Sequence, residues 1–351
     1  MPLERMDDFF NTRADTYDSH MLTSIIIAKR DDCVSSVYGD VHRNADYINN
    51  LLDFIRREYG IEATGISPAK RGFYGETWKV DTASHSYFVK LDYSDTHKYI
   101  YARSFPVIEH LCSHGIDYIS RIVKTVDCRL FTHYNGAVLG VFDWIEGENI
   151  ETDATKIPEY QMLAKIYTVP ADGLSIPYVD YSGKSSDKFF KQWDTLDDTQ
   201  ISTLFEKNRS KLEHRAARLK YFAAICRSDM TGYVITHGDA GGNLIVSGDK
   251  YYIVDWDEPI LAPPERDAWN MLFYEGKEWA GCIFQKALRD NGIRYTLRSE
   301  RLAYFCYYYF FFYLTEYLDN FTRLDRKRKT ELEQYFDGWA ENRASYADTI
   351  Q

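Results

Sequence analysis

The chain has 351 residues, more than one hydrophobic core usually supports, so two packed lobes or domains are expected. Its formal net charge of −11, from 42 basic and 53 acidic side chains, leaves no overall positive field to hold a nucleic acid or an anionic membrane surface. The composition therefore argues against nucleic-acid and membrane partners and suits a cationic small molecule.

The cysteines show neither a metal-binding nor a disulfide pattern. They are scattered, without a CxxC pair or zinc-like spacing with histidine, at positions 33, 112, 128, 226, 282 and 306. Asp7 and Asp8 stand where a signal peptide needs basic residues followed by an apolar run. We therefore expect reduced thiols in a cytoplasmic protein.

The first predicted element is an amphipathic helix. Residues 1–42 are polar and irregular, and no role is predicted for them. After them, Asp46 can cap a helix, and Gly60 lies where that helix would stop. The apolar residues between these two positions have the i, i+3, i+4, i+7 spacing of one buried helical face: Ile48, Leu51, Leu52 and Ile55.

The strands that follow predict a mainly antiparallel sheet. Runs of β-forming residues cover 76–80, 86–93, 129–134 and 137–145. Asn135-Gly136, between the last two runs, is a strong signal for a type I′ hairpin. One helix is predicted over 101–114, with Pro106 near its start and Gly115 at its end.

Long helical segments dominate from Pro158 onward. They include 159–167, 202–225 and the apolar run 303–314, whose twelve residues are too few for a membrane-spanning helix of about 20 and predict a buried helix. One short β unit is embedded among them, at 233–236, 243–246 and 251–256.

These elements predict an α+β fold of two lobes. A small antiparallel-sheet N-lobe that binds nucleotide is expected over 43–146, and a larger, mainly helical C-lobe over 147–351. The two should be joined tightly near 142–148, because no low-complexity linker separates them. Residues 1–42 form an N-terminal extension.

The strongest chemical signal lies in the run YVITHGDAGGNLIVSGDKYYIVDWDEPILAPPERD, from Tyr233 to Asp267. Asp239 follows one strand, Asn243 opens the next strand after a glycine-rich loop, and Asp255 comes as another strand ends. Phosphoryl transfer from ATP needs one carboxylate to orient the attacking hydroxyl, plus an amide and a second carboxylate to hold Mg²⁺. The alternative interpretation is two ordinary acidic turns beside strands.

These motifs resemble the aminoglycoside phosphotransferase family, which has a protein-kinase-like fold. The HGD loop with its Asn and the strand ending in VDW carry the resemblance, and VDWDEPILAPPERD looks like the spectinomycin-phosphotransferase branch. The resemblance implies that Asp239 is the catalytic base, that Asn243 and Asp255 bind Mg²⁺, and that Asp267 braces the site. One departure is that Asn243 follows Asp239 by four positions, where the kinase pattern has five.

Lys90 is the candidate for contacting the nucleotide phosphates. It lies on the apolar run YFVKL, where a lone lysine is costly unless it faces a cleft, although a solvent-facing lysine of an alternating strand is the alternative. A protein kinase pairs this lysine with a glutamate on the following helix. Glu109 is the obvious helical carboxylate here, but alignment on the helix end puts Ser104 nearer that position.

Three further features concern the nucleotide and the acceptor. Gly72 and Gly75 could close a backbone loop over phosphates, or mark only a hairpin. The segment 142–149 resembles the hinge of the family, which implies that backbone atoms of Asp143 and Ile145 contact adenine. Substrate-side carboxylates are the remaining feature: Asp257 and Glu258 could face a positively charged acceptor or be solvated turn residues.

The sequence thus predicts an ATP- and Mg²⁺-dependent phosphotransferase, with GTP as an alternative donor, that acts on a hydroxyl group of an aminoglycoside or aminocyclitol antibiotic. No obligate protein partner is evident. Two alternatives stay open: a metabolic kinase of the methylthioribose, choline or homoserine type, and a catalytically dead nucleotide-binding module.

Overall fold

A computed structural model describes residues 43–69, 75–93, 95–150, 152–271, 279–319, 330 and 332–351. The N-terminal extension 1–42 and Gly72 lie outside the described residues. The chain divides into two compact units, each described by itself. We call them the sheet unit (43–177 and 237–260) and the helical unit (178–236 and 261–351). The predicted lobes with a border near 142–148 stay a prediction.

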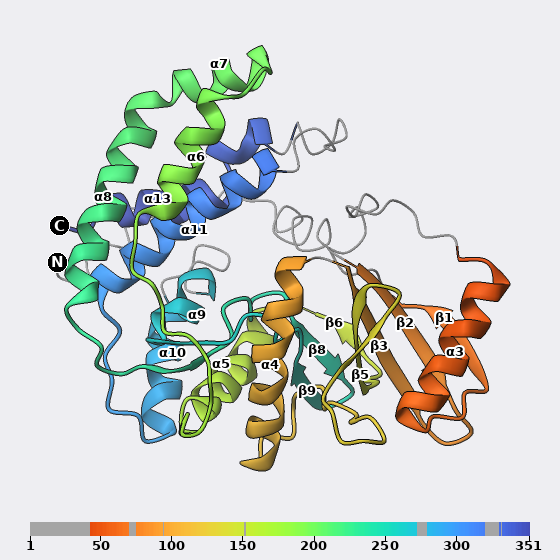
Figure 1. Ribbon diagram of the computed structural model, residues 1–351. Helices are drawn as coiled ribbons and strands as arrows, with labels where there is room; N and C mark the ends of the chain where they lie inside the picture. The colour runs from red at the N-terminus through yellow and green to blue at the C-terminus, as the bar shows by residue number, and fades with distance from the viewer. Residues whose placement is uncertain are drawn as a thin grey trace. The chain divides into compact units, whose positions relative to one another are not determined.

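The sheet unit contains a five-stranded antiparallel sheet, as the sequence predicts (Figure 1). Its order is β1-β2-β3-β5-β4, with β1 Gly65–Pro68, β2 Gly75–Asp81, β3 Ser86–Asp92, β4 Thr132–Tyr134 and β5 Ala137–Asp143. The β4–β5 turn has the predicted form, because Asn135 and Gly136 both have positive φ, at 47° and 84°. In the middle of the sheet, Lys90 pairs with Gly140.

One face of this sheet is covered by α3 (Ala45–Tyr59). Leu51 and Ile55 of the helix are fully buried in one core with strand residues such as Val89. The predicted helix stop is confirmed, because Gly60 adopts a left-handed φ of 68° and donates its N–H to Arg56. The predicted cap is wrong: the side chain of Asn44 accepts from the Tyr47 N–H, and Asp46 lies in the first turn.

The other face of the sheet receives α4 (Asp95–Ser113). Phe105 of this helix packs edge-on against Phe142 of β5, with ring centroids 5.3 Å apart. A Cβ on Gly140 would come within 2.7 Å of the Phe105 ring, so the absence of a side chain at Gly140 makes room for this contact. The helix begins before the predicted start at residue 101 and carries Pro106 in its interior.

A second, three-stranded sheet completes the sheet unit. Its order is β6-β8-β9, with β6 Glu148–Asn149, β8 Leu244–Ser247 and β9 Lys250–Ile253, and α5 (Asp153–Ile166) contacts β9. The antiparallel β8–β9 pair corresponds to two segments of the predicted short β unit. The remaining predicted segment is β7 (Val234–Thr236), which pairs with β10 (Ile260–Ala262) in a separate sheet. The loops before and after the β8–β9 pair contain Asp239 and Asp255.

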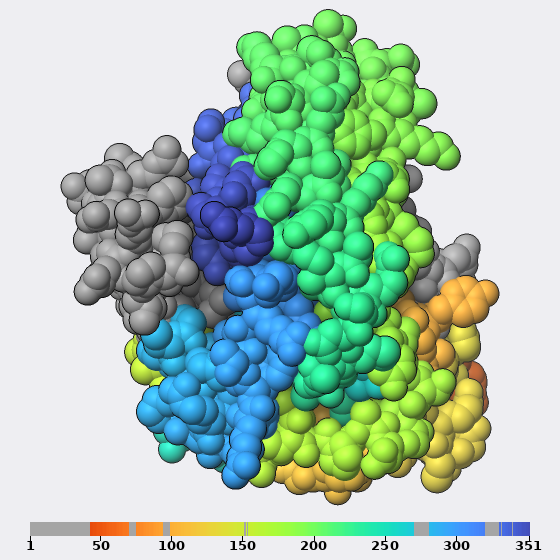
Figure 2. Space-filling view, turned by 90° about the vertical axis from the view of Figure 1, so that its left-hand side faces the viewer, coloured from red at the N-terminus to blue at the C-terminus, as the bar shows by residue number. Residues whose placement is uncertain are grey.

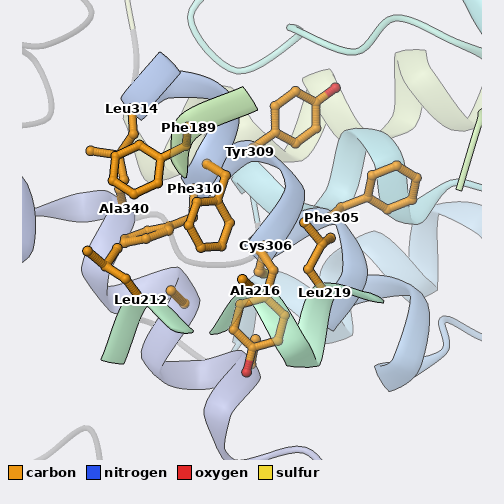
Figure 3. Packing of buried hydrophobic residues seen from close by; sticks show 14 of the residues in the cluster. Phe189, Leu212, Ala216, Leu219, Phe305, Cys306, Tyr309, Phe310, Leu314 and Ala340 are labelled. Atoms are coloured by element: carbon orange, nitrogen blue, oxygen red, sulfur yellow. The ribbon is translucent and has the colours of Figure 1, made fainter. Parts of the chain in front are cut away.

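In the helical unit, α6, α8, α9 and α13 pack against the aromatic helix α11 (Ser299–Asp319). Figure 3 shows side chains of α6, α8, α11 and α13 meeting in one apolar core. The predicted burial of 303–314 is confirmed, and none of the helices in the described part of the chain is long and apolar enough to cross a bilayer. The elements of this unit are α6 Lys184–Asp194, α7 Thr199–Lys207, α8 Arg209–Arg227, β7 Val234–Thr236, β10 Ile260–Ala262, α9 Glu265–Met271, α10 Trp279–Asp290, α11, η5 Gln334–Phe336 and α13 Trp339–Asp348.

The single helix predicted over 202–225 is wrong in one respect, because two helices meet at Asn208. The side chain of Asn208 donates to the Leu204 carbonyl oxygen and ends α7 there. In α8, the buried guanidinium of Arg215 forms ion pairs with Glu341 and Asp348 of the C-terminal residues. Figure 2 shows the dark blue C-terminal surface against the green surface of α8.

Candidate active site

The loop after β7 is held in shape by His237. Its ring is buried, accepts the Asp239 N–H at Nδ1 (3.1 Å) and lies 3.0 Å from the Val254 carbonyl oxygen at Nε2. Because a backbone N–H can only donate, Nδ1 must be the acceptor and Nε2 the protonated donor. His237 is therefore a neutral support that ties the Asp239 loop to the end of β9.

Asn243 closes the loop onto Asp239. Its side-chain Nδ2 lies 2.6 Å from the Asp239 carbonyl oxygen and 3.3 Å from Asp239 Oδ2. The backbone of Asn243 donates to the Ala240 carbonyl oxygen and accepts from the Val254 N–H. Because the amide nitrogen is committed to the loop, Oδ1 is the atom that Asn243 can offer to a cation.

Asn149, which the sequence analysis did not single out as a site residue, clamps the same loop from β6. Its Nδ2 donates to the carbonyl oxygens of Gly242 (2.9 Å) and Leu244 (2.7 Å). These partners lie more than ninety positions away along the chain. No local spacing points to Asn149, and only the pairing of β6 with β8 brings it to the loop.

Asp255 follows β9 in a strained backbone conformation. Its φ is 66°, in the left-handed region, which costs a residue with a Cβ roughly 1–2 kcal/mol. Strain of this kind persists where surrounding structure imposes it and is concentrated at functional sites. The conformation turns the half-exposed carboxylate toward Lys90.

Lys90, in β3, contacts the carboxylates of Asp255 and Asp257. Its Nζ lies 3.0 Å from Asp255 Oδ1 and 2.5 Å from Asp257 Oδ2, and its side chain is only 16% exposed. Burial lowers the pKa of Lys90, but the Asp255 and Asp257 charges outweigh this effect and hold the pKa well above its ordinary value. Lys90 is thus a charged group inside the site and not a solvent-facing lysine.

Helix α4 brings an aromatic ring to Lys90. Nζ lies 5.2 Å from the ring centroid of Tyr101, whose hydroxyl donates to Asp92 (3.1 Å). Glu109, the helical carboxylate considered from the sequence, forms an ion pair with Lys124, and Ser104 is fully buried. The structure does not bring Glu109 to Lys90.

The contacts of Gly75, Asp143 and Ile145 do not test their predicted roles in nucleotide binding. A Cβ on Gly75 would lie 1.9 Å from the Leu91 carbonyl oxygen, so strand packing alone requires glycine there. The Asp143 N–H donates to the Arg121 carbonyl oxygen (2.9 Å), and the Asp143 carbonyl oxygen accepts from Ser120 (3.0 Å). Ile145 lies just past the end of β5. Adenine contacts at Asp143 and Ile145 stay a prediction.

The donor chemistry of this site fits Mg²⁺. The candidate ligands are oxygens, from the carboxylates of Asp239 and Asp255 and the amide of Asn243, and hard divalent cations prefer oxygen. The ammonium of Lys90 contacts the carboxylates of both Asp255 and Asp257. The described residues contain no cluster of three or more His, Cys, Asp or Glu suited to a metal, so an ion would also draw on Asn243 and on phosphate oxygens.

Comparison with known proteins gives a sequence match and structural matches. The sequence matches the model of the phosphotransferase enzyme family over residues 65–304. No curated protein sequence matches the chain.

Three similar structures contain bound ligands. Spectinomycin phosphotransferase APH(9)-Ia, in complex with ADP and spectinomycin, is 20% identical, with a TM-score of 0.70 over 86% of this chain and 97% of that chain. APH(2″)-IIIa with GDP and kanamycin is 12% identical, with a TM-score of 0.59 over 86% and 99%. Amicoumacin kinase hAmiN with AMP-PNP, Ca²⁺ and Ami is 13% identical, with a TM-score of 0.59 over 88% and 97%. These similarities confirm the predicted α+β protein-kinase-like fold.

Proposed function

The chain belongs to the phosphotransferase enzyme family, and on this premise we propose that it transfers the γ-phosphoryl group of ATP to a hydroxyl group of an aminoglycoside or aminocyclitol. One observation carries the proposal. Lys90 Nζ contacts Asp255 Oδ1, and Asn243, which contacts Asp239 through its side chain, accepts the N–H of Val254, the residue before Asp255, at its backbone carbonyl oxygen. That set matches what phosphoryl transfer requires.

Asp239 is the proposed catalytic base. It lies on a loop fixed by His237 and Asn243, and such fixation is what orienting a hydroxyl group and accepting its proton require. Asn243 Oδ1 and the Asp255 carboxylate would hold Mg²⁺, which neutralises phosphate charge when it is bound. Lys90 would contact the phosphates with its ammonium group.

An acceptor with positive charge suits this protein. The net charge is −11, and Glu258 is exposed next to the site carboxylates. Two of the similar structures contain spectinomycin and kanamycin. Because Asp257 contacts Lys90, Glu258 is the better candidate of the two for an acceptor contact. The described cysteines are free thiols, which supports the proposed cytoplasmic location.

An assay of ADP and GDP release tests this proposal. The enzyme is supplied with Mg²⁺ and ATP or GTP and with a panel of aminoglycosides, spectinomycin, other aminocyclitols, methylthioribose, choline and homoserine. We expect acceptor-dependent ADP release with an aminoglycoside or aminocyclitol, with the phosphorylated product visible by mass spectrometry. Turnover with the metabolites alone would establish a metabolic kinase. Nucleotide binding without turnover on any acceptor would indicate a dead module.

A further inference from the structure

Lys90 has two carboxylate partners, and only one of them has a proposed metal role. Asp257 makes the shorter contact, 2.5 Å against 3.0 Å for Asp255. The Asp257 carboxylate is also the less exposed of the two, at 27% against 48%. If Asp255 held a divalent cation, Asp257 would be the carboxylate left to contact Lys90.

The helix beside Lys90 supplies no such group among its described side chains. Tyr101 presents its ring to Nζ, and the hydroxyl of that tyrosine is anchored on Asp92. Glu109 is engaged with Lys124, and the Ser104 hydroxyl carries no charge. Lys90 therefore contacts an aromatic ring of α4, and a carboxylate that balances its charge must come from another element.

The turn that carries Asp257 is fixed by the residue before it. Trp256 is buried, its Nε1 donates to the Ile253 carbonyl oxygen (3.2 Å), and its ring packs edge-on against His237 with centroids 4.6 Å apart. Asp255 is held in a left-handed conformation on the same turn. Trp256 thus links the turn that carries Asp257 to His237, the residue that supports the Asp239 loop.

We propose that Asp257 is the positioning residue for Lys90, supplying from the turn after β9 the counter-charge that a protein kinase takes from a helix glutamate. The inference rests on the proposed function and deepens it. It assigns Asp257 to the nucleotide side of the site, through Lys90, and leaves the acceptor to other groups. The ligand concerned is the phosphate chain of the nucleotide.

The test separates phosphate binding from nucleoside binding. Asp257→Asn removes the charge with little change of shape, and Asp257→Glu keeps it. Asp249→Asn, in the exposed β8–β9 turn, is the matched control for loss of one negative charge. Calorimetric titration with Mg²⁺-ADP and, separately, with adenosine gives both affinities, and circular dichroism confirms that each variant is folded.

We expect Asp257→Asn to weaken ADP binding roughly tenfold, a typical coupling for residues in direct contact, while adenosine binding is unchanged. Asp257→Glu should restore most of the ADP affinity, and Asp249→Asn should behave as wild type. In a Lys90→Met background, Asp257→Asn should have no further effect on ADP affinity, because its action passes through Lys90.

Two other outcomes have distinct meanings. Unchanged ADP affinity in Asp257→Asn, with a raised KM for the acceptor, would overturn the inference and return Asp257 to the acceptor side. A wild-type protein that binds neither ADP nor ATP would instead refute the proposed function itself.

Discussion

The side-chain amide of Asn243 donates a hydrogen bond to the main-chain carbonyl oxygen of Asp239, with 2.6 Å between Nδ2 and O. This contact shows where the shortened loop places Asn243: beside the backbone of Asp239. Gly242 adopts a φ of 110°, which only glycine reaches without strain, and the tightened loop then returns Asn243 to Asp239. The four-residue step therefore keeps the two residues in contact.

Asp239→Asn should lower kcat roughly 10²- to 10⁴-fold, the usual range for a positioned general base, while nucleotide affinity stays nearly intact. The substitution keeps the shape of the side chain, and the His237 and Asn243 contacts to the Asp239 backbone remain. Steady-state kinetics with the acceptor found by the panel, together with ADP titration, measures both quantities. Turnover near the wild-type rate would refute the assignment of Asp239.

Asn149→Ala should reduce both stability and turnover. The carbonyl oxygens of Gly242 and Leu244 lose their side-chain donor, and leaving buried acceptors without a partner costs roughly 1–3 kcal/mol. Since this donor fixes the Asp239–Asn243 loop, kcat should also fall. Urea unfolding and steady-state kinetics measure the two effects.

Asn208→Ala is the matched control for Asn149→Ala. Asn208 also donates a side-chain hydrogen bond to a backbone carbonyl oxygen, but it lies between α7 and α8 in the helical unit. Loss of the Asn208 hydrogen bond should lower the free energy of unfolding without changing kcat of the folded enzyme. If the two variants affect kcat equally, the clamp has no specific role in the site.

Local sequence patterns predicted most helices and strands of this fold, but they did not predict the contacts between distant segments. The spacing of Leu51 and Ile55 and the Asn135-Gly136 turn act within a few residues, so the sequence shows them directly. Asn149 reaches its loop through the pairing of β6 with β8, and Lys90 contacts Asp257, which lies 167 positions further along the chain; one sequence does not show such long-range contacts. The break at Asn208 depends on a single side-chain hydrogen bond, which helical periodicity does not register.

Gly140→Ala should destabilise the sheet unit. The added Cβ would lie 2.7 Å and 2.9 Å from atoms of the buried Phe105 ring, and overpacking of this kind typically costs about 1–3 kcal/mol. Thermal unfolding measures the effect, and Gly140→Ala combined with Phe105→Leu should recover part of the loss. Gly65→Ala, in β1 of the same sheet, is the control, because its Cβ would meet its nearest atoms at an ordinary 3.9 Å. Equal losses in the two alanine variants would contradict the steric explanation.

Glu265, in the helical unit, should make stability depend on pH. The carboxylate is fully buried, accepts from the Tyr295 hydroxyl at both oxygens (2.9 Å) and accepts from the Arg298 N–H (2.6 Å). Burial raises the pKa of Glu265 to about 6, although these hydrogen bonds and the charge of Arg301 oppose the shift.

A raised pKa means that the folded state holds the proton of Glu265 more tightly than the unfolded state does. The resulting stabilisation is complete below the unfolded pKa of 4.5 and is lost as the pH rises through about 6. The shift corresponds to about 2 kcal/mol. Glu265→Gln has no such proton to lose. The difference in free energy of unfolding, wild type minus Glu265→Gln, should therefore fall by most of that amount between pH 4.5 and 7.

Urea unfolding at a series of pH values measures the difference between the two proteins. Tyr295→Phe provides the mechanistic control, because removing the hydroxyl that donates to Glu265 should raise its pKa further and move the pH window upward. A difference between wild type and Glu265→Gln that stays constant from pH 4.5 to 7 would show that Glu265 titrates alike in the folded and unfolded states. Burial and the hydrogen bonds donated by Tyr295 and Arg298 would then cancel at this carboxylate.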